Sequence, residues 1–298
     1  MLLPSSWVVT AFSAVTPPNN KPTTATSKTA SIKKTKTDKL NFHQVLQRVG
    51  KTVFRPGGSQ ATEILHAWAA ADFHPNSVVL ELSAGLGTGG MALADQYKCH
   101  VVLSDRDTSR LDQAAQMAKE RGLDDLVQVR PLDMRTIDTS LAGDEHYDAV
   151  IVEASLTHMP TAVKTKIFAD LHAHTKQVLL HEIVVLDGTT PEQASAIGRE
   201  VGSSLGVGFH PLTLGEWTDL LEQNGYQVTH TQCGPLQFLN PIHILQDEGL
   251  GGMGKIAWNL ATHADLRQRV LSTKQMMESH RDHLGYIILR ATTTTEWP

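Results

Sequence analysis

The fold is decided by the stretch Val79-Leu80-Glu81-Leu82-Ser83-Ala84-Gly85-Leu86-Gly87-Thr88-Gly89-Gly90. It joins an apolar run, Ser77 to Leu82, to an expected helix over Thr88 to Tyr97. The uninterrupted apolar run is typical of a buried parallel strand. The glycines permit a sharp turn and a close approach of ligand to backbone, and the helix start adds free N–H groups. We therefore expect a nucleotide-like ligand at this turn.

Helices alternate with short β-branched runs on both sides of the turn, which predicts an α/β fold with a doubly wound, mostly parallel sheet of seven strands. The expected strands are Ser77–Leu82, His100–Ser104, Leu126–Pro131, Tyr147–Val152, Gln177–Leu186, Tyr226–Thr231 and Gly285–Ala291. The expected helices are Leu40–Val49, Ser59–Ala71 with Ser59 as N-cap, Thr88–Tyr97, Asp107–Arg121, Thr161–Thr175 and one from the capping box at Thr213 to Gly225.

A helix-rich insert separates the last two strands, at about residues 232–284. Because of it we expect these two strands to form a C-terminal antiparallel pair. The insert contains glycines between Gly249 and Gly254 and one expected long helix, Lys255 to Arg281, with an apolar face and a basic face. Such a helix is a lid hinged at the glycines, a membrane-surface helix, or a plain cover helix with a solvated back.

Residues 1–39 form a segment apart from the domain at 40–298. The segment is rich in Thr, Ser and Lys, lacks Arg and has no apolar periodicity, so it cannot bury enough surface to fold. It is a disordered tail or a targeting segment. The expected location is the cytoplasm, or a plastid or mitochondrion if these residues are a transit peptide.

Charge and cysteine content exclude several classes of protein. Residues 1–40 hold six Lys and one Asp, which leaves 20 bases and 30 acids of the chain totals of 26 and 31. This excess of acidic residues after residue 40 disfavours nucleic acid as a partner. The chain has two cysteines, Cys99 and Cys233, outside any CxxC pair, and no HExxH motif, so no metal is expected. No apolar run is long enough to span a membrane, and the oligomeric state is unknown.

Two kinds of cofactor compete for the glycine turn. Gly85, Gly87 and Gly90 satisfy GxGxxG, and Asp105 follows Gly85 by twenty residues, as in dinucleotide-binding sites. Against a dinucleotide, the charge of Glu81 at the strand end would oppose a pyrophosphate and favour a cationic amino-acid group. Asp133 closes the third strand, where an acid meets an adenine amino group.

With these residues the chain resembles the class I S-adenosylmethionine-dependent methyltransferases over about Leu40 to Ala291. The resemblance implies a Rossmann-like methyltransferase fold, S-adenosyl-L-methionine as cofactor, and an acid-x-Gly-x-Gly-x-Gly turn in which Ser83 replaces the first glycine. It implies these cofactor-binding residues: Glu81, Ser83, Gly85, Gly87, Asp105, Arg106, Asp133 and Met134. Of these, Asp105 would hold the ribose, and Asp133 with Met134 would face the adenine.

The acceptor side is expected at the carboxyl ends of the fourth and fifth strands. Glu153 ends the fourth strand, His158 follows it, and His181 lies in the fifth beside Glu182. We predict Glu153, His181 and His158 as catalytic residues, the histidines as bases or orienters. Neighbouring strand residues face opposite ways, so only one of His181 and Glu182 should reach the pocket.

The predicted function is methyl transfer to a small organic or lipid-like acceptor by a soluble enzyme. An Asn/Asp-Pro-Pro-aromatic motif is absent at Glu153, which disfavours a nucleobase acceptor. The alternatives are an NAD(P)-dependent oxidoreductase and a non-catalytic methyltransferase-like scaffold.

Overall fold

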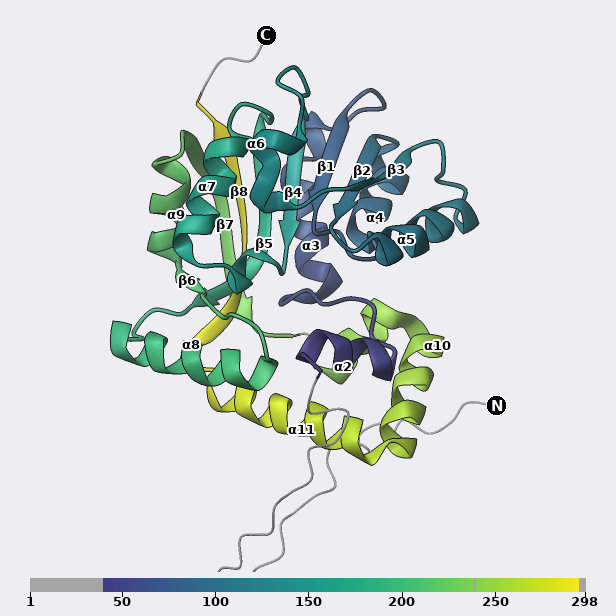
Figure 1. Cartoon of the computed structure of the whole chain (residues 1–298), viewed down its shortest axis with the longest axis vertical. Helices are drawn as coiled ribbons and strands as arrows, with labels where there is room; N and C mark the ends of the chain where they lie inside the picture. Colours follow the sequence, from purple (N-terminus) through teal and green to yellow (C-terminus); the bar gives the residue numbers. More distant parts are fainter. Residues whose placement is uncertain (1–39, 238–239, 295–298) are drawn as a thin grey trace, which may run out of the picture.

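The protein is an α/β sandwich with a separate layer of helices at one end (Figure 1). The computed structural model describes residues 40–237 and 240–294; the predicted tail or targeting segment, residues 1–39, lies outside them. The strands are β1 Val78–Leu82, β2 His100–Asp105, β3 Val127–Pro131, β4 Ala149–Glu153, β5 Gln177–Val185, β6 Leu212–Thr213, β7 Tyr226–Pro235 and β8 Leu284–Thr293.

The sheet has the order β3-β2-β1-β4-β5-β8-β7, with the two-residue β6 paired to β5. Strands β1 to β5 are parallel, whereas β8 runs antiparallel to both β5 and β7. The expected doubly wound sheet with a C-terminal antiparallel pair is therefore confirmed. Because β8 is antiparallel, residues 40–237 and 240–294 do not form the second nucleotide-binding half of a dinucleotide-binding fold.

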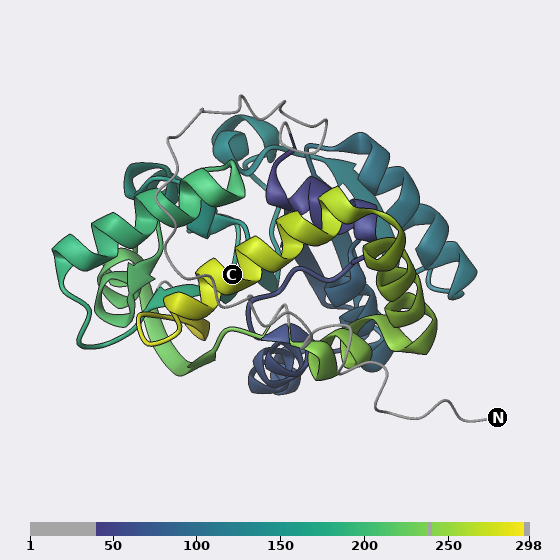
Figure 2. The same cartoon turned by 90° about the horizontal axis from the view of Figure 1, so that it is seen from below.

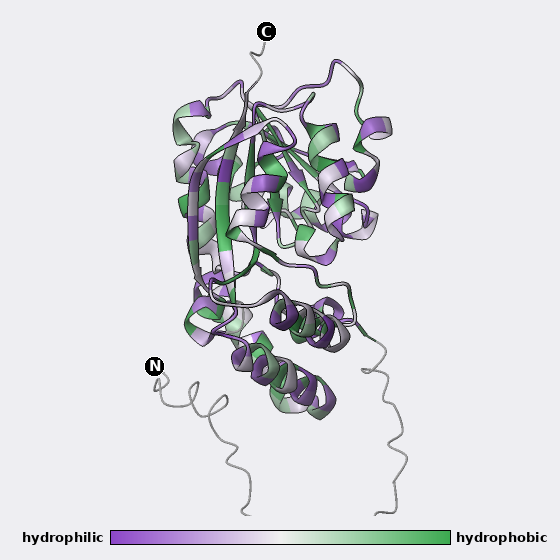
Figure 3. Cartoon of the chain, turned by 90° about the vertical axis from the view of Figure 1, so that its left-hand side faces the viewer, coloured by the Kyte–Doolittle hydropathy of each residue, from purple (hydrophilic) through white to green (hydrophobic). Residues whose placement is uncertain are grey.

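Helices cover both faces of the sheet. Their bounds are α2 Phe42–Val49, α3 Gly58–Trp68, α4 Thr88–Tyr97, α5 Thr108–Glu120, α6 Ile137–Ser140, α7 Thr161–Leu171, α8 Pro191–Leu205, α9 Leu214–Glu222, α10 Pro241–Thr262 and α11 Ala264–Ser279. Short 3-10 turns are η2 Ala70–Asp72, η3 Met134–Thr136 and η4 Leu156–His158. One core lies between the sheet and α7 with α9, and another between the sheet and α3, α4 and α5. Figure 3 shows hydrophobic strand residues enclosed between these layers.

A third core lies beyond the carboxyl ends of the parallel strands, in the cap layer. We use this name for α2, α8, α10 and α11, which pack on one another there (Figure 2). Apolar side chains of α2, α8 and α11 meet the end of β5 and the start of β8 in this core. The cap layer therefore covers the edge of the sheet where ligands bind in open α/β folds.

The structure corrects several expected boundaries. The expected helix Lys255–Arg281 is two helices, α10 and α11, which are separated at His263, and α10 begins as early as Pro241 with a kink at Gly249. The N-cap of α3 is Gly57 rather than Ser59. Helix α8 was not expected, although its capping box, Thr190 with Gln193 and a proline between them, is readable in the sequence. Strand β6 is too short to leave a pattern.

Candidate active site

The turn after β1 has a left-handed backbone at alternate residues. Ser83, Gly85 and Gly87 have φ angles of 53°, 59° and 66°. Ser83, which departs from the family pattern, thus adopts the conformation that favours glycine at its position. A side chain at Gly87 would place its Cβ 2.2 Å from Leu103 Cδ1. The turn therefore needs glycine at Gly87 both for its conformation and for its packing on β2.

Glu81 points into the protein rather than toward a ligand. Its side chain is buried between β1 and α4, and its Oε2 accepts a hydrogen bond from Gly90 N at 2.8 Å. Burial, with the nearby Glu153 carboxylate, raises the pKa of Glu81 to about 8. At neutral pH the free protein holds this carboxyl mostly protonated, so the argument that its negative charge opposes a pyrophosphate is wrong.

Asp105 ends β2 and fixes the glycine turn. Its Oδ2 accepts from Gly85 N and its Oδ1 from Asp107 N, both at 2.9 Å. The next residue, Arg106, is exposed. The structure thus brings Asp105 to the turn, at the place where the resemblance expects the ribose, and leaves Arg106 at the rim.

Asp133 and Met134 follow β3 and differ in environment. Asp133 caps η3 and pairs with the Arg135 side chain, whose hydrogen bonds lower the pKa of Asp133. Met134 is 3% exposed and belongs to the core between the sheet and α7. The Asp133 carboxylate therefore lies after the edge strand β3, whereas Met134 has little surface left for a ligand.

Glu153 is the centre of a buried polar cluster at the end of β4. Arg55 Nε lies 2.7 Å from Glu153 Oε2, an ion pair without linear hydrogen-bond geometry. Thr62 donates its hydroxyl hydrogen to Oε1, and His181 Nδ1 lies 3.1 Å from the same oxygen. Arg55 Nη2 also donates to Thr88 Oγ1 at 2.9 Å, which ties the cluster to the first residue of α4.

The charge of Glu153 is set by its cationic neighbour. Burial alone would raise the pKa of Glu153, but Arg55, with His181 and His66, outweighs burial and holds it far below its ordinary range. Burial lowers the pKa of His66 to about 4, so this ring on α3 is neutral at pH 7. At neutral pH the cluster therefore holds an ionised Glu153 beside the Arg55 guanidinium.

His181 has both ring nitrogens engaged. Gly57 N donates to His181 Nε2 at 2.8 Å, so in this neutral ring the proton lies on Nδ1, toward Glu153. The side chain is fully buried. No lone pair is left to accept a substrate proton, so a base role for His181 is contradicted and an orienting role for Glu153 fits its contacts.

Glu182 faces the other way, as neighbouring strand residues must. Its carboxylate accepts hydrogen bonds from Ser155 N, Leu156 N and Thr157 N, at 2.8 to 3.1 Å. It fixes the loop that carries His158. Of the two neighbours on β5, His181 therefore reaches the cluster and Glu182 shapes the loop beyond it.

An apolar pocket begins where the Glu153 cluster ends. It lies between β4, β5 and the cap layer and opens to solvent, and the space between its walls together with this opening is about 490 Å³. Its lining residues are Phe42, His43, Leu46, Phe54, Pro56, Ala154, Thr157, His158, Ile183, Leu205 and Met277. Two of them, Pro56 and Ala154, directly follow Arg55 and Glu153. The ion pair and the pocket therefore share a wall.

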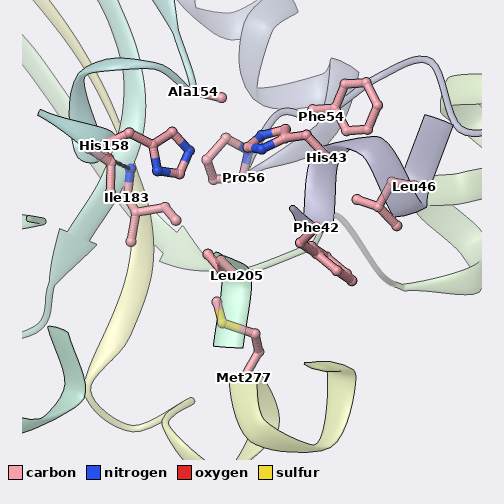
Figure 4. Close-up of a pocket in the computed structure, with 11 residues that line it drawn as sticks. Phe42, His43, Leu46, Phe54, Pro56, Ala154, His158, Ile183, Leu205 and Met277 are labelled. Carbon is pink, nitrogen blue, oxygen red and sulfur yellow. Dashed lines mark hydrogen bonds between the residues drawn. The ribbon is translucent and has the colours of Figure 1, made fainter. Parts of the chain in front are cut away.

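His43 and His158 face each other in this pocket (Figure 4). Their ring centroids are 5.2 Å apart in an edge-to-face arrangement. His158 Nδ1 lies 2.9 Å from Gly208 O, and a carbonyl accepts, so this nitrogen carries the proton and Nε2 keeps its lone pair. Burial, with His158 and Arg110 nearby, lowers the pKa of His43 to about 4. His43 is therefore uncharged at neutral pH.

Sequence reasoning missed Arg55, Thr62 and His66. Each lies before the glycine turn, in the segment from Arg55 into α3, where no motif singles them out. A signal exists in Gly57, because a Cβ there would lie 2.7 Å from Ala61 Cβ and 2.8 Å from Tyr286 Cγ. Glycine at position 57 thus allows this segment to pack closely against Tyr286 of β8, where Gly57 N donates to His181 Nε2.

The strand order, the glycine turn after β1 and the carboxylates that end β2 and β4 are typical of nucleotide-binding α/β folds. Residues 79–177 match the methyltransferase domain family. A Haemophilus influenzae protein of uncharacterised activity is 31% identical over 244 residues, which cover 80% of this chain and 92% of that protein.

Solved structures share the fold at low identity. A methyltransferase from Geobacter sulfurreducens bound to S-adenosyl-L-homocysteine has a TM-score of 0.61 and 15% identity, over 85% of this chain and 99% of that one. Geranyl diphosphate C-methyltransferase from Streptomyces coelicolor has a TM-score of 0.56 and 15% identity, over 79% and 78%. The cyclase SpnF has a TM-score of 0.64 and 14% identity, over 85% and 93%. Residues 79–177 thus belong to the methyltransferase domain family, which makes the protein a class I S-adenosylmethionine-dependent methyltransferase.

Proposed function

We propose that the protein transfers a methyl group from S-adenosylmethionine to an uncharged, largely apolar acceptor bound between β4, β5 and the cap layer. The observation that carries the proposal is the pocket, which is lined mainly by apolar side chains and adjoins the Glu153–Arg55 pair. Among the described residues that line it, none is Lys, Arg, Asp or Glu, so a charged acceptor would lose hydration without gaining a partner.

The residues at the glycine turn fit the cofactor. The left-handed turn opens a close approach to the backbone, and Asp105 fixes its shape. Arg55 lies over the N-terminus of α4, where a guanidinium and a helix end both favour an anion. We assign Arg55 to the carboxylate of the methionine part and Asp105 to the ribose, with Asp133 near the adenine.

Glu153 and its neighbours position the cofactor rather than move protons. Its far-lowered pKa keeps it ionised, so it is a poor general base but a suitable partner for an ammonium group. Thr62 and His181 fix its orientation through Oε1, which leaves Oε2 for Arg55 and the ligand. His181 is thus a positioning residue.

Bound S-adenosylmethionine supplies an electrophilic methyl group on its sulfonium. The apolar pocket excludes water and holds the acceptor in line for displacement. His158, with Nδ1–H donated to Gly208 O, presents Nε2 as the acceptor for a hydroxyl or N–H proton on the substrate. An acceptor with an apolar body and one protic group fits both features.

One solved structure with the same fold supports an acceptor with an apolar body. The Streptomyces coelicolor relative acts on geranyl diphosphate, an apolar chain with a diphosphate. Among the described lining residues, Lys and Arg are absent, so the pocket itself provides no Lys or Arg to a diphosphate and we favour acceptors without one.

The test is a transfer assay with S-adenosylmethionine labelled in its methyl group. Matched acceptors would include apolar phenols, long-chain alcohols and their carboxylated or phosphorylated counterparts. We expect label in the uncharged set, and Phe54→Ala should reduce its turnover while leaving S-adenosylhomocysteine affinity unchanged. Preferential labelling of the charged counterparts would reject the proposal.

A further inference from the structure

Helix α10 carries an exposed apolar face. Ile242, Leu245, Leu250 and Trp258 are 68%, 38%, 82% and 70% exposed, and they are the large exposed hydrophobic residues of the described part of the chain. Ile242 and Leu245 precede the kink at Gly249 and Leu250 and Trp258 follow it, so the exposed hydrophobics are concentrated in this element, whereas scattered single ones would need no explanation.

The pattern along α10 shows that the exposure is not incidental. After the kink at Gly249, the exposed positions Leu250, Gly254, Ala257, Trp258 and Ala261 repeat at helical spacing, so they form one apolar stripe. The opposite side is apolar as well, with Ile244 and Ile256 buried against the domain. The outer stripe is therefore an exposed apolar surface beside the buried side of the helix, and a cover on it would remove apolar area from water.

The neighbouring helix α11 shows the contrast. It follows α10 after the turn at His263, lies at an angle to it in the same cap layer (Figure 2), and buries Leu266, Val270 and Met277. Its outward positions Gln268 and Gln275 are polar and exposed. Solvent therefore suits the outer side of α11 but not that of α10.

The acidic residues of α10 are turned away from its outer face. Asp247 and Glu248 are 1% and 3% exposed, and their carboxylates lie 3.5 and 3.7 Å from Lys51 Nζ. Glu248 also accepts from Thr52 N at 2.7 Å, and Asp247 from Ser59 N at 2.9 Å. These contacts remove both negative charges of the helix from its surface.

The charge that α10 does expose is positive. Lys255 is exposed and packs its side-chain carbons against Gly50, and the exposed Arg48 lies on the adjoining α2. Further bases lie in the chain before α2, where residues 1–40 hold six Lys and one acid. In a body of 20 bases and 30 acids, an outer face without an exposed carboxylate is complementary to an anionic surface.

From the apolar stripe of α10, the exposed bases Lys255 and Arg48 beside it and the burial of its two carboxylates, we infer that α10 docks the protein on an anionic lipid surface. Leu250 and Trp258 are exposed on a segment whose residues 251, 252 and 254 are glycines without side chains. The two large side chains are therefore accessible for insertion among lipid headgroups, where tryptophan is favoured. A second copy of this acidic chain would bring like charges together. No described helix is long and apolar enough to cross a bilayer, so the helix lies on the surface.

The experiment is cosedimentation of the full chain with vesicles of phosphatidylcholine alone or mixed with phosphatidylglycerol. We expect binding to the anionic vesicles, weakened by salt. Leu250→Ser with Trp258→Ser should lower the partition coefficient at least about tenfold, because two large apolar side chains leave the lipid. The matched control is Gln268→Ser with Gln275→Ser on α11, which should bind like the parent.

Three outcomes would overturn the inference. The first is failure of the parent chain to bind either vesicle. The second is vesicle binding that the α10 double variant leaves unchanged, which assigns attachment to the basic N-terminal residues. The third is a dimer in sedimentation velocity that the α10 variant dissociates while no vesicle is bound. The double variant should keep the parent's melting midpoint, because both altered side chains are exposed.

Discussion

Replacement of Glu81 by glutamine should change how stability depends on pH. In the native state the pKa of this carboxyl is raised by burial from 4.5 to about 8. Between these values the folded protein binds more protons at Glu81 than the unfolded chain, so wild-type stability falls as pH rises. At 1.36 kcal/mol per unit, the full window corresponds to about 5 kcal/mol as an upper bound.

The glutamine variant lacks this loss because it does not ionise. Near pH 5 the two proteins should have similar free energies of unfolding, since Glu81 is then protonated when folded. Near pH 9 the variant should be the more stable one, by several kcal/mol and not more than about 5. Urea denaturation at both pH values measures the difference.

The matched control is Glu63→Gln on the exposed side of α3. It removes an exposed carboxylate and keeps Glu81, so the loss of stability between pH 5 and pH 9 that we assign to Glu81 should persist in this variant. If Glu81→Gln gave the same difference at pH 5 and pH 9, Glu81 would be ionised throughout, and the argument from burial would fail.

Three further predictions concern the site. Arg55→Met and Glu153→Gln should each lower the free energy of unfolding by about 3 kcal/mol, because each leaves the other charge buried. The double variant should lose at least about 1.5 kcal/mol less than the sum of the two single losses. Additive losses in chemical denaturation would contradict the ion pair. His158→Gln should lower turnover on a protic acceptor at least about 100-fold with unchanged S-adenosylhomocysteine affinity, and full activity would remove it from the mechanism. Ser83→Gly should raise stability by up to about 1 kcal/mol by relieving a left-handed non-glycine residue, and a loss in thermal melting would show that the serine side chain makes a compensating contact.

The sheet was predictable because its strands are buried on both faces. Strand β1 is an apolar run that needs no partner to be recognised, and the insert before β8 implied an antiparallel return. The orientation of individual side chains was not readable in this way. Glu81 ends a strand like a ligand-binding acid, yet it is buried against Gly90, and only the packing of α4 shows this.

The Glu153 cluster shows a second limit. Glu153 and His181 were expected from strand ends, because parallel strands bring their carboxyl ends to one edge. Arg55 and Thr62 reach the same point from a loop and a helix before the first strand. Contacts across about 90 residues depend on how α3 docks on the sheet, which no local pattern determines.

The cap layer illustrates why the break between α10 and α11 was missed. The sequence from Lys255 to Arg281 has helical spacing throughout, and nothing at His263 interrupts it. The chain turns there because α11 must cross the end of the sheet to bury Val270 and Met277 in the third core. Tertiary packing thus outweighs local preference.

Calorimetric titration of the full chain with S-adenosylhomocysteine addresses the cofactor site most directly. We expect saturable binding at one site per chain, weakened at least about tenfold by Arg55→Met and retained by Phe54→Ala. No heat with this nucleoside, together with saturable binding of NAD, would contradict the assignment of the turn after β1.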